Sequence, residues 1–251
     1  LPINSGVFCL KKDRFQDVVW IGTDGQGVYL YSNPLYSIKS MVLSNYTEKI
    51  ERPVRAIYLD DERTFWVGTK GNGILKIYDY EFDKNISDCR AEVLTTSNSA
   101  LSSNAVYCFA KSHRNLLWIG DEEGLTYYSY REKRIKSIPI RIGNEDFKYI
   151  HDIYETADSE LWLASVGMGV VKARIAGTPD NPVIVDAQRY VINDGELGSN
   201  YFFTIYAENE ANLLFGNKGY GVFRYNETTN GLEPVSTHKY ENMTLNNILA
   251  I

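Results

Sequence analysis

VVWIGTDGQGVY, at residues 18–29, is the stretch around which this sequence is organised, because it recurs four more times. The later copies are TFWVGTKGNGI at 64–74, LLWIG with GL at 116–125, ELWLA with GV at 160–170, and NLLFG with GV at 212–222. Self-similarity at a fixed period indicates a repeat architecture. The residues expected to anchor the repeats share the tryptophan position and are Trp20, Trp66, Trp118, Trp162 and Leu214.

A pair of apolar residues three positions apart precedes each copy. The first member lies 13 residues before the tryptophan position in the first repeat and 12 before it in the others. Successive first members are 47, 52, 44, 52 and 46 residues apart, so two independent landmarks share one period. The pairs are Val7/Leu10, Val54/Ile57, Val106/Phe109, Ile150/Ile153, Phe202/Ile205 and, at the C-terminus, Ile248/Ile251.

Each repeat is predicted to contain four short strands, because runs rich in Val, Ile, Tyr, Phe and Thr are separated by turn residues. In the first repeat these strands cover 7–11, 18–22, 28–32 and 37–43. Residues three apart on a regular strand point to opposite faces, so the apolar pairs predict a sheet that is covered on both faces. Four-stranded units of roughly 40–50 residues that sandwich one another describe an all-β protein, a β-propeller.

The blades of this propeller are predicted at approximately 6–52, 53–104, 105–146, 147–199 and 200–245. Residues 246–251 are predicted to form the first strand of the next blade. Five repeats plus this strand are expected to be part of a seven-bladed ring.

Composition argues against several classes of protein. Apolar residues make up 44% and charged residues 23% of the 251 residues, which is ordinary for a soluble globular protein. The net charge of −6 argues against a general nucleic-acid binder, which needs a basic surface, so no nucleic-acid partner is predicted for this segment. Cys9, Cys89 and Cys108 match no zinc signature and are predicted to be structural thiols.

No catalytic or metal-binding pattern stands out. His113, His151 and His238 lie in different repeats without metal-ligand spacing, so neither a metal site nor a cofactor is predicted. The acidic runs at 60–62 and 121–123 fall in turns and are expected to be solvated. A propeller glycosidase would need two carboxylates facing one cleft, and nothing in the sequence singles out such a pair. We therefore expect no catalytic residues and no enzymatic activity in this segment.

The strings LSSNAV at 101–106 and WIGTDGQGVYLY at 20–31 resemble two-component regulator propeller repeats. The resemblance extends over the whole chain, although the fourth repeat has Ala164-Ser165 for Gly-Thr and the fifth lacks its tryptophan. It implies the extracytoplasmic sensor of a hybrid two-component system of the Bacteroidetes type, whose full-length protein carries a second propeller, a membrane span and a histidine kinase.

On the basis of this resemblance, we expect a periplasmic module of an inner-membrane protein that binds a glycan-derived oligosaccharide. The expected partners are further propeller repeats, a second propeller of the same protein and a second copy of the full sensor in a homodimer. Two alternatives stay open, namely a propeller carbohydrate-active enzyme (a lyase or glycosidase) and a protein-interaction scaffold.

The ligand is expected at the end of the blades where the first strands begin. There the linkers between repeats meet the turns between the second and third strands. Sugar recognition uses aromatic faces beside polar or charged groups. By that rule the candidate ligand-binding residues are Tyr46, Arg52, Arg141, Asn144, Tyr201, Lys218 and Tyr220.

Overall fold

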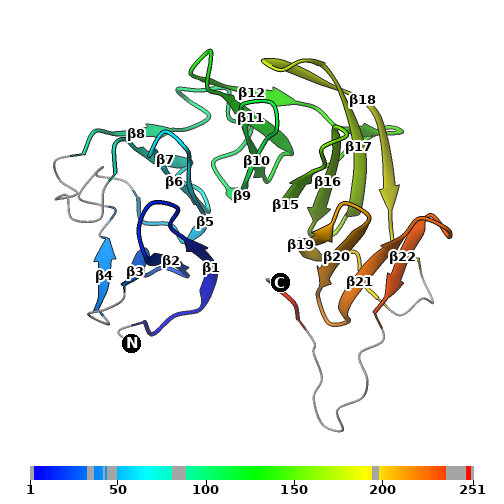
Figure 1. Cartoon of the computed structure of the whole chain (residues 1–251), viewed down its shortest axis with the longest axis horizontal. Helices are drawn as coiled ribbons and strands as arrows, with labels where there is room; N and C mark the ends of the chain where they lie inside the picture. Colours follow the sequence, from blue (N-terminus) through cyan, green and yellow to red (C-terminus); the bar gives the residue numbers. More distant parts are fainter. Residues whose placement is uncertain are drawn as a thin grey trace, which may run out of the picture. The chain divides into compact units, whose positions relative to one another are not determined.

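The chain forms five four-stranded sheets, the blades of a propeller-type fold (Figure 1). The computed structural model describes residues 3–32, 37–41, 43, 50–80, 89–193, 198–235 and 247–249, so Tyr46, His238 and Ile251 lie outside the described residues. Over the described residues the chain forms strands and turns but no α-helix, and therefore none long and apolar enough to cross a lipid bilayer. The predicted all-β architecture of four-stranded blades is confirmed.

In every blade the strands lie in the order in which they occur in the chain. The first blade contains β1 (Val7–Lys12), β2 (Val18–Thr23), β3 (Val28–Ser32) and β4 (Ser37–Met41). The second contains β5 (Val54–Leu59), β6 (Phe65–Thr69), β7 (Ile74–Ile77) and β8 (Ala91–Leu94). The third contains β9 (Val106–Lys111), β10 (Leu116–Asp121), β11 (Leu125–Ser129) and β12 (Arg134–Ile138). The fourth contains β15 (Ile150–Glu155), β16 (Glu160–Ser165), β17 (Gly169–Thr178) and β18 (Asn181–Tyr190). The fifth contains β19 (Phe202–Asn209), β20 (Asn212–Asn217), β21 (Gly221–Asn226) and β22 (Gly231–Pro234).

Two features were not predicted. Strands β17 and β18 are ten residues each, so their hairpin is longer than those of the other blades. The linker after the third blade contains a small hairpin of β13 (Arg141–Ile142) and β14 (Glu145–Asp146). The chain divides into two compact units, Leu1–Phe109 and Ala110–Ile251, and each contact described below lies within one of them.

Consecutive blades approach one another where the Trp-x-Gly motif of a second strand meets the first strand of the next blade. Trp66 is fully buried, and its ring centroid lies 6.3 Å from that of Phe109. A Cβ atom placed on Gly68 would lie only 2.8 Å from Val106 Cγ1 and 3.2 Å from the Phe109 ring. Glycine is therefore needed at this position because any side chain would push the next blade away.

The same approach occurs at two other blades. A Cβ atom on Gly22 would lie 3.4 Å from Val54 Cγ1, and one on Gly216 would lie 2.8 Å from Ile248 Cγ2. Ile248 thus contacts the fifth blade as Val106 contacts the second. At these three blades the contact constrains the repeat spacing, since the apolar segment that follows must reach the glycine of the blade before it.

The apolar pair of the first strand does not point to opposite faces, contrary to the prediction. Val54 pairs with Thr69 and Ile57 pairs with Val67 across the β5–β6 ladder. Thr69 and Val67 are two residues apart and share a face, so Val54 and Ile57 share that face too. The cause is a β-bulge at Arg55, an extra residue that shifts the alternation by one. The same register shift occurs near the start of β1, β15 and β19.

The acidic turn residues are also not uniformly solvated, contrary to the prediction. Asp60 is 1% exposed, and its Oδ2 accepts a hydrogen bond from Trp66 Nε1 at 2.9 Å. Its Oδ1 accepts the N–H groups of Glu62 at 3.0 Å and Thr64 at 2.7 Å. Asp121 is fully buried. A buried indole N–H needs an acceptor, and a carboxylate provides one while closing the turn.

The third blade meets this need differently. Ser112 occupies the turn position that Asp60 holds in the second blade, and Trp118 Nε1 donates instead to Glu155 Oε2 at 2.7 Å. The Glu155 side chain is 1% exposed, and Arg114 Nε lies 3.6 Å from its Oε1. A carboxylate from the fourth blade therefore replaces the missing one in the third.

Cys9 and Cys89 are partly buried, and Cys108 is buried. Cys9 Sγ lies against β2, only 2.4 Å from where a Cβ atom on Gly22 would stand. Burial raises the pKa of the Cys9 thiol from 9.0 to about 11. This thiol is consequently neutral and poorly nucleophilic at physiological pH.

Replacing Asp60 by alanine is expected to lower the free energy of unfolding by about 2–4 kcal/mol, because it strands the buried Trp66 N–H and two backbone donors. The neighbouring Asp61→Ala change removes a partly exposed ion pair with Arg14 and should cost less than about 1 kcal/mol. Urea unfolding of both variants measures the difference. Equal losses for the two variants would contradict the assigned role of Asp60.

The Cys9 thiol should also make stability fall at alkaline pH. The folded thiol keeps its proton up to about pH 11, whereas the unfolded thiol loses it above about pH 9. The unfolded state therefore binds fewer protons in that window, and stability falls as pH rises. The free energy of unfolding of the wild type, relative to that of Cys9→Ala, should fall by about 1 kcal/mol between pH 8 and pH 10. Urea unfolding at each pH measures this difference. A constant difference between the two proteins would refute this.

Candidate functional site

A recurrent hydrogen bond fixes two residues next to each other at one end of several blades. We call this the top end; it is where the first strand begins and the second strand ends. The backbone N–H that follows the second strand donates to the carbonyl that precedes the first strand, at 2.9 Å from Lys70 to Pro53 and at 3.0 Å from Lys218 to Tyr201. The two bonded residues belong to different repeat landmarks, and their side chains therefore project from the same place on the blade.

The Ser-Asn sequence before a first strand holds the top end of the preceding blade. The carbonyl of Asn200 accepts hydrogen bonds from Gly167 N–H at 2.9 Å and Gly169 N–H at 3.1 Å. The Asn200 side chain accepts the Ile192 N–H at 2.7 Å and so ties the linker to the end of β18. Asn104 holds the turn of the second blade with its carbonyl in the same way, at 2.9 Å to each glycine.

The residue at the apex of the turn between second and third strands folds back onto its own blade in three cases. Its side chain accepts a backbone N–H from the linker before the first strand. The acceptor and donor pairs are Gln26 with Asn4 at 2.8 Å, Asn72 with Arg52 at 2.9 Å, and Met168 with Lys148 at 3.3 Å. We call this bond the apex latch.

Among the described residues, the fifth blade shows no apex latch. Tyr220 holds the apex position there, and its side chain makes no hydrogen bond to any described residue and is 44% exposed. The glycines on either side, Gly219 and Gly221, have φ angles of 88° and 79°, in the left-handed region that favours glycine. The turn therefore keeps its conformation, while its apex side chain is exposed to solvent.

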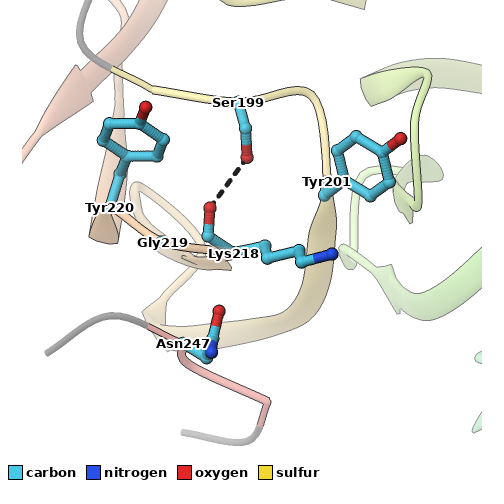
Figure 2. Close-up of a pocket in the computed structure, with 6 residues that line it drawn as sticks. All are labelled: Ser199, Tyr201, Lys218, Gly219, Tyr220 and Asn247. Atoms are coloured by element: carbon cyan, nitrogen blue, oxygen red, sulfur yellow. Dashed lines mark hydrogen bonds between the residues drawn. The ribbon is translucent and has the colours of Figure 1, made fainter.

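Tyr220 lines a shallow, open pocket of about 670 Å³ at the top end of the fifth blade. The lining residues come from the linker before β19, from the β20–β21 turn and from the segment after the fifth blade. Figure 2 shows the rings of Tyr201 and Tyr220 on opposite sides of Ser199 and Lys218. The full lining is Ser199, Tyr201, Lys218, Gly219, Tyr220 and Asn247.

Lys218 provides the charge of the pocket. Its Nζ lies 5.2 Å from the centroid of the Tyr201 ring, and it forms no ion pair with a described residue. A cation over an exposed aromatic ring gains about 0.5–1 kcal/mol, enough to bias the position of a flexible lysine. The ammonium group thus stays beside the Tyr201 face while its N–H donors remain available.

The floor of the pocket is rigid. Asn217 is fully buried, and its Nδ2 donates to the Ser199 carbonyl at 2.6 Å. The Ser199 hydroxyl lies 3.0 Å from Asn217 Oδ1 and 2.9 Å from the Lys218 carbonyl, which Figure 2 shows. The hydroxyl hydrogen is therefore used in a hydrogen bond within the floor of the pocket, and the hydroxyl oxygen can still accept a hydrogen bond from a ligand.

Three of the seven candidate residues predicted from sequence, Tyr201, Lys218 and Tyr220, line this pocket together. Arg52, Arg141 and Asn144 are not among its lining residues. Arg52 is an exposed residue of the first unit whose backbone N–H bonds Asn72. Tyr46 lies outside the described residues.

Arg141 and Asn144 are placed by the unpredicted β13–β14 hairpin. Arg141 Nε forms an ion pair with Asp146 Oδ1 at 2.9 Å, and Asn144 is an exposed turn residue. Arg189 of β18 pairs with Glu145 at 2.9 Å, which holds the hairpin against the outer strand of the fourth blade. Arg141 is therefore neutralised in a place that does not belong to the pocket.

Sequence reasoning missed Ser199, Asn247 and Tyr149. Ser199 and Asn247 precede the apolar landmark of a first strand by three residues and one residue, so the repeat alignment could have pointed to them. Tyr149 occupies the repeat position of Tyr201 in the fourth blade, is 42% exposed and has a φ of 55°. A bulky residue with that φ is uncommon, and here it adds a third exposed ring at the top ends of the second unit.

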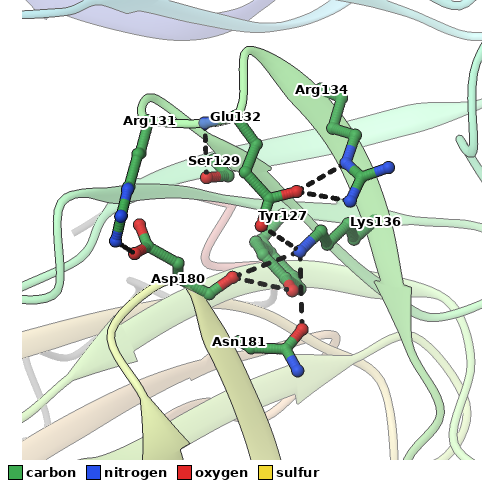
Figure 3. Close-up of polar contacts among 8 residues, drawn as sticks. All are labelled: Tyr127, Ser129, Arg131, Glu132, Arg134, Lys136, Asp180 and Asn181. Atoms are coloured by element: carbon green, nitrogen blue, oxygen red, sulfur yellow. Dashed lines mark hydrogen bonds and ion pairs between the residues drawn. The ribbon is translucent and has the colours of Figure 1, made fainter.

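The other polar clusters neutralise themselves. Glu132 of the β11–β12 turn accepts hydrogen bonds from Arg134 and Lys136, each at 2.6 Å (Figure 3). Those hydrogen bonds, the one from Lys136 first, lower the pKa of Glu132. Arg131 pairs with Asp180 at the tip of the long hairpin at 2.6 Å. Among the described residues no three His, Cys, Asp or Glu side chains gather in a way that could hold a metal ion.

No family model matches this sequence. Over 140 residues the chain is 31% identical to translation initiation factor 6 of Saccharolobus solfataricus, a match that covers 51% of this chain and 57% of that protein. The chain thus spans just over half the length of this relative. The resemblance to two-component regulator propeller repeats continues to rest on the repeat motifs themselves.

Several solved structures are similar over most of the chain. The extracellular domain of a protein described as a hybrid two-component system of B. thetaiotaomicron has a TM-score of 0.68 at 21% identity, over 94% of this chain and 29% of that one. An extracellular domain described as a one-component system of the same organism has a TM-score of 0.60 at 15% identity, over 94% and 44%. PorZ, a surface component of the type-IX secretion system of Porphyromonas gingivalis, has a TM-score of 0.60 at 14% identity, over 83% and 30%. At these identities the likeness shows a shared fold, and this chain spans less than half of each structure.

Because Tyr220 forms no apex latch with a described residue, we expect substitutions at the apex position to affect stability differently in the second and fifth blades. Asn72→Ala removes the apex latch of the second blade, including bonds to the N–H groups of Glu51 and Arg52, and should lower the free energy of unfolding by about 1 kcal/mol. Tyr220→Ala removes no such bond and should stay within about 0.5 kcal/mol of the wild type. Chemical unfolding tests both. A larger loss for Tyr220→Ala than for Asn72→Ala would mean that Tyr220 is structural.

Proposed function

We propose that this chain is the ligand-sensing part of an extracytoplasmic sensor in a hybrid two-component system, and that it binds a glycan-derived oligosaccharide. The observation that carries the proposal is the pair of exposed tyrosines, Tyr201 and Tyr220, that flank Lys218 in one pocket. The likeness in fold to extracellular domains of such systems supports it.

The chemistry of the pocket suits a sugar. Tyrosine rings offer apolar faces to the C–H groups of a sugar ring, with a polar tip for its hydroxyls. Lys218, Ser199 and Asn247 add donors and acceptors around those faces. The pocket is shallow and open, which favours one end or one side of an extended chain over a small enclosed molecule.

A catalytic role is disfavoured because the buried carboxylates already have structural tasks. Asp60 and Glu155 accept hydrogen bonds from tryptophan indoles, and the exposed Glu132 is paired with two cations. A glycosidase needs two carboxylates that face one cleft, and none of the described residues that line the pocket of the fifth blade is a carboxylate. The alternatives of a lyase, a glycosidase or a protein-interaction scaffold are separated from a sensor by whether a sugar binds and whether it is turned over.

Signalling requires parts beyond this chain. A ligand shifts an equilibrium only by binding one state better than another, so the sugar must bridge elements that move relative to each other. We place these blades in a seven-bladed ring of a homodimeric periplasmic protein that is anchored in the inner membrane, with a second propeller and a histidine kinase elsewhere in it. The contact of Ile248 with Gly216 and the bridge between Lys218 and Asn247 support a further blade beginning there.

Calorimetry against a panel of defined oligosaccharides, run beside an assay for product formation, tests the proposal. At least one sugar should bind without being cleaved. The Tyr201→Ala/Tyr220→Ala double variant should bind it at least about tenfold more weakly, since two ring contacts together contribute about 1–3 kcal/mol. Both side chains are exposed, so the melting temperature should not change.

Tyr206→Ala is the matched control, because Tyr206 is an equally exposed tyrosine, 43% accessible, that does not line the pocket. It should bind the sugar like the wild type. Cleavage of any sugar would overturn the assignment as a sensor, and full affinity in the double variant would remove this pocket from the site.

A further inference from the structure

The pocket contains a cation that no described carboxylate balances. At nearby linkers and turns of the second unit, cations are paired. Lys148 Nζ lies 2.5 Å from Glu123 Oε2, and Arg141 Nε lies 2.9 Å from Asp146 Oδ1. Lys218 forms no ion pair with a described residue, and its ammonium group lies 5.2 Å from the centroid of the Tyr201 ring.

Backbone contacts fix the position of Lys218 in the pocket. Its backbone is held from both sides, because its N–H donates to the Tyr201 carbonyl at 3.0 Å and its carbonyl accepts from the Ser199 hydroxyl at 2.9 Å. It also forms a β-bridge with Asn247. Figure 2 shows its side chain extending toward Tyr201, across the middle of the pocket.

The other groups around Lys218 complete a site for a sugar with a negative charge. The Asn247 amide offers a donor and an acceptor, and the Ser199 oxygen offers an acceptor to ring hydroxyls. A sugar ring laid on Tyr201 would bring a substituent at its edge to the ammonium group. A charge-assisted hydrogen bond from that ammonium to an anionic oxygen is stronger than one to a neutral hydroxyl.

We propose that this pocket selects acidic oligosaccharides, in which a carboxylate or a sulfate ester on the sugar ring pairs with Lys218. The inference rests on the proposed function and narrows its ligand class. The net charge of −6 does not oppose it, because charges more than about 8 Å apart are largely screened at physiological salt, whereas the contact with Lys218 is direct.

The test measures the affinity of the full chain for three probes by calorimetry. The probes are a galacturonic acid trisaccharide, its fully methyl-esterified form and a sulfated galactose trisaccharide. The acid should bind at least about tenfold more tightly than its neutral ester, and this preference should shrink as salt is raised. The relative affinity of the sulfated probe tells whether carboxylate or sulfate is the better partner.

Lys218→Met should abolish the preference for the acid while leaving the affinity for the ester unchanged. The matched control is Lys70→Met, since Lys70 is an exposed lysine at the same repeat position of the second blade, outside the pocket. It should keep the full preference. Equal binding of acid and ester by the wild type, or a preference that survives Lys218→Met, would overturn the inference and leave a neutral-sugar sensor standing. If no neutral or acidic oligosaccharide binds at all, the proposed function fails together with it.

Discussion

The absence of a side chain at one position of the repeat is the constraint on which the fold depends. At Gly68 the space of a missing Cβ is taken by Val106 and Phe109 of the following strand. The indole of Trp66, two residues earlier on the same face, fills the wider gap beside it. Close approach at the glycine and bulk at the tryptophan together set how two sheets meet. Both residues are present in the first three repeats, whereas the fourth has Ala164 for the glycine and the fifth has Leu214 for the tryptophan.

This constraint explains which parts of the fold could be predicted from sequence. Trp, Gly and the apolar pair are local signals that recur, so strands and blade type followed from their spacing. The β-bulge at Arg55 did not, because nothing distinguishes an inserted residue from a regular one until the partner strand is known. The burial of Asp60 depends on where the Trp66 N–H points. The replacement of this carboxylate by Glu155 in the third blade depends on a contact between residues 37 positions apart.

The candidate site, too, could be predicted from the sequence only in part. Tyr201, Lys218 and Tyr220 could be grouped from sequence because each lies next to a repeat landmark in the same blade. Arg141 could not be excluded, because its partner Asp146 and the hairpin that joins them leave no repeat signal. Ser199 and Asn247 are small polar residues that matter only through backbone contacts. The most informative signal in the sequence was a departure from the repeat, namely a tyrosine at the apex position where other blades place a side chain that bonds their own linker.

That departure also links the pocket to the packing of blades. Asn217 lies beneath Ser199, and its own carbonyl accepts the N–H of Ile248 at 3.2 Å, the residue that contacts Gly216. A ligand that holds Lys218 and Asn247 together therefore acts on the same few residues that join the fifth blade to the segment after it. The free energy of ligand binding would stabilise that junction when it is formed, and this stabilisation would be lost when the junction opens. The pocket and the contact with Ile248 share Asn217, a fully buried side chain, so a ligand in the pocket would act on how firmly the fifth blade holds the segment that follows it.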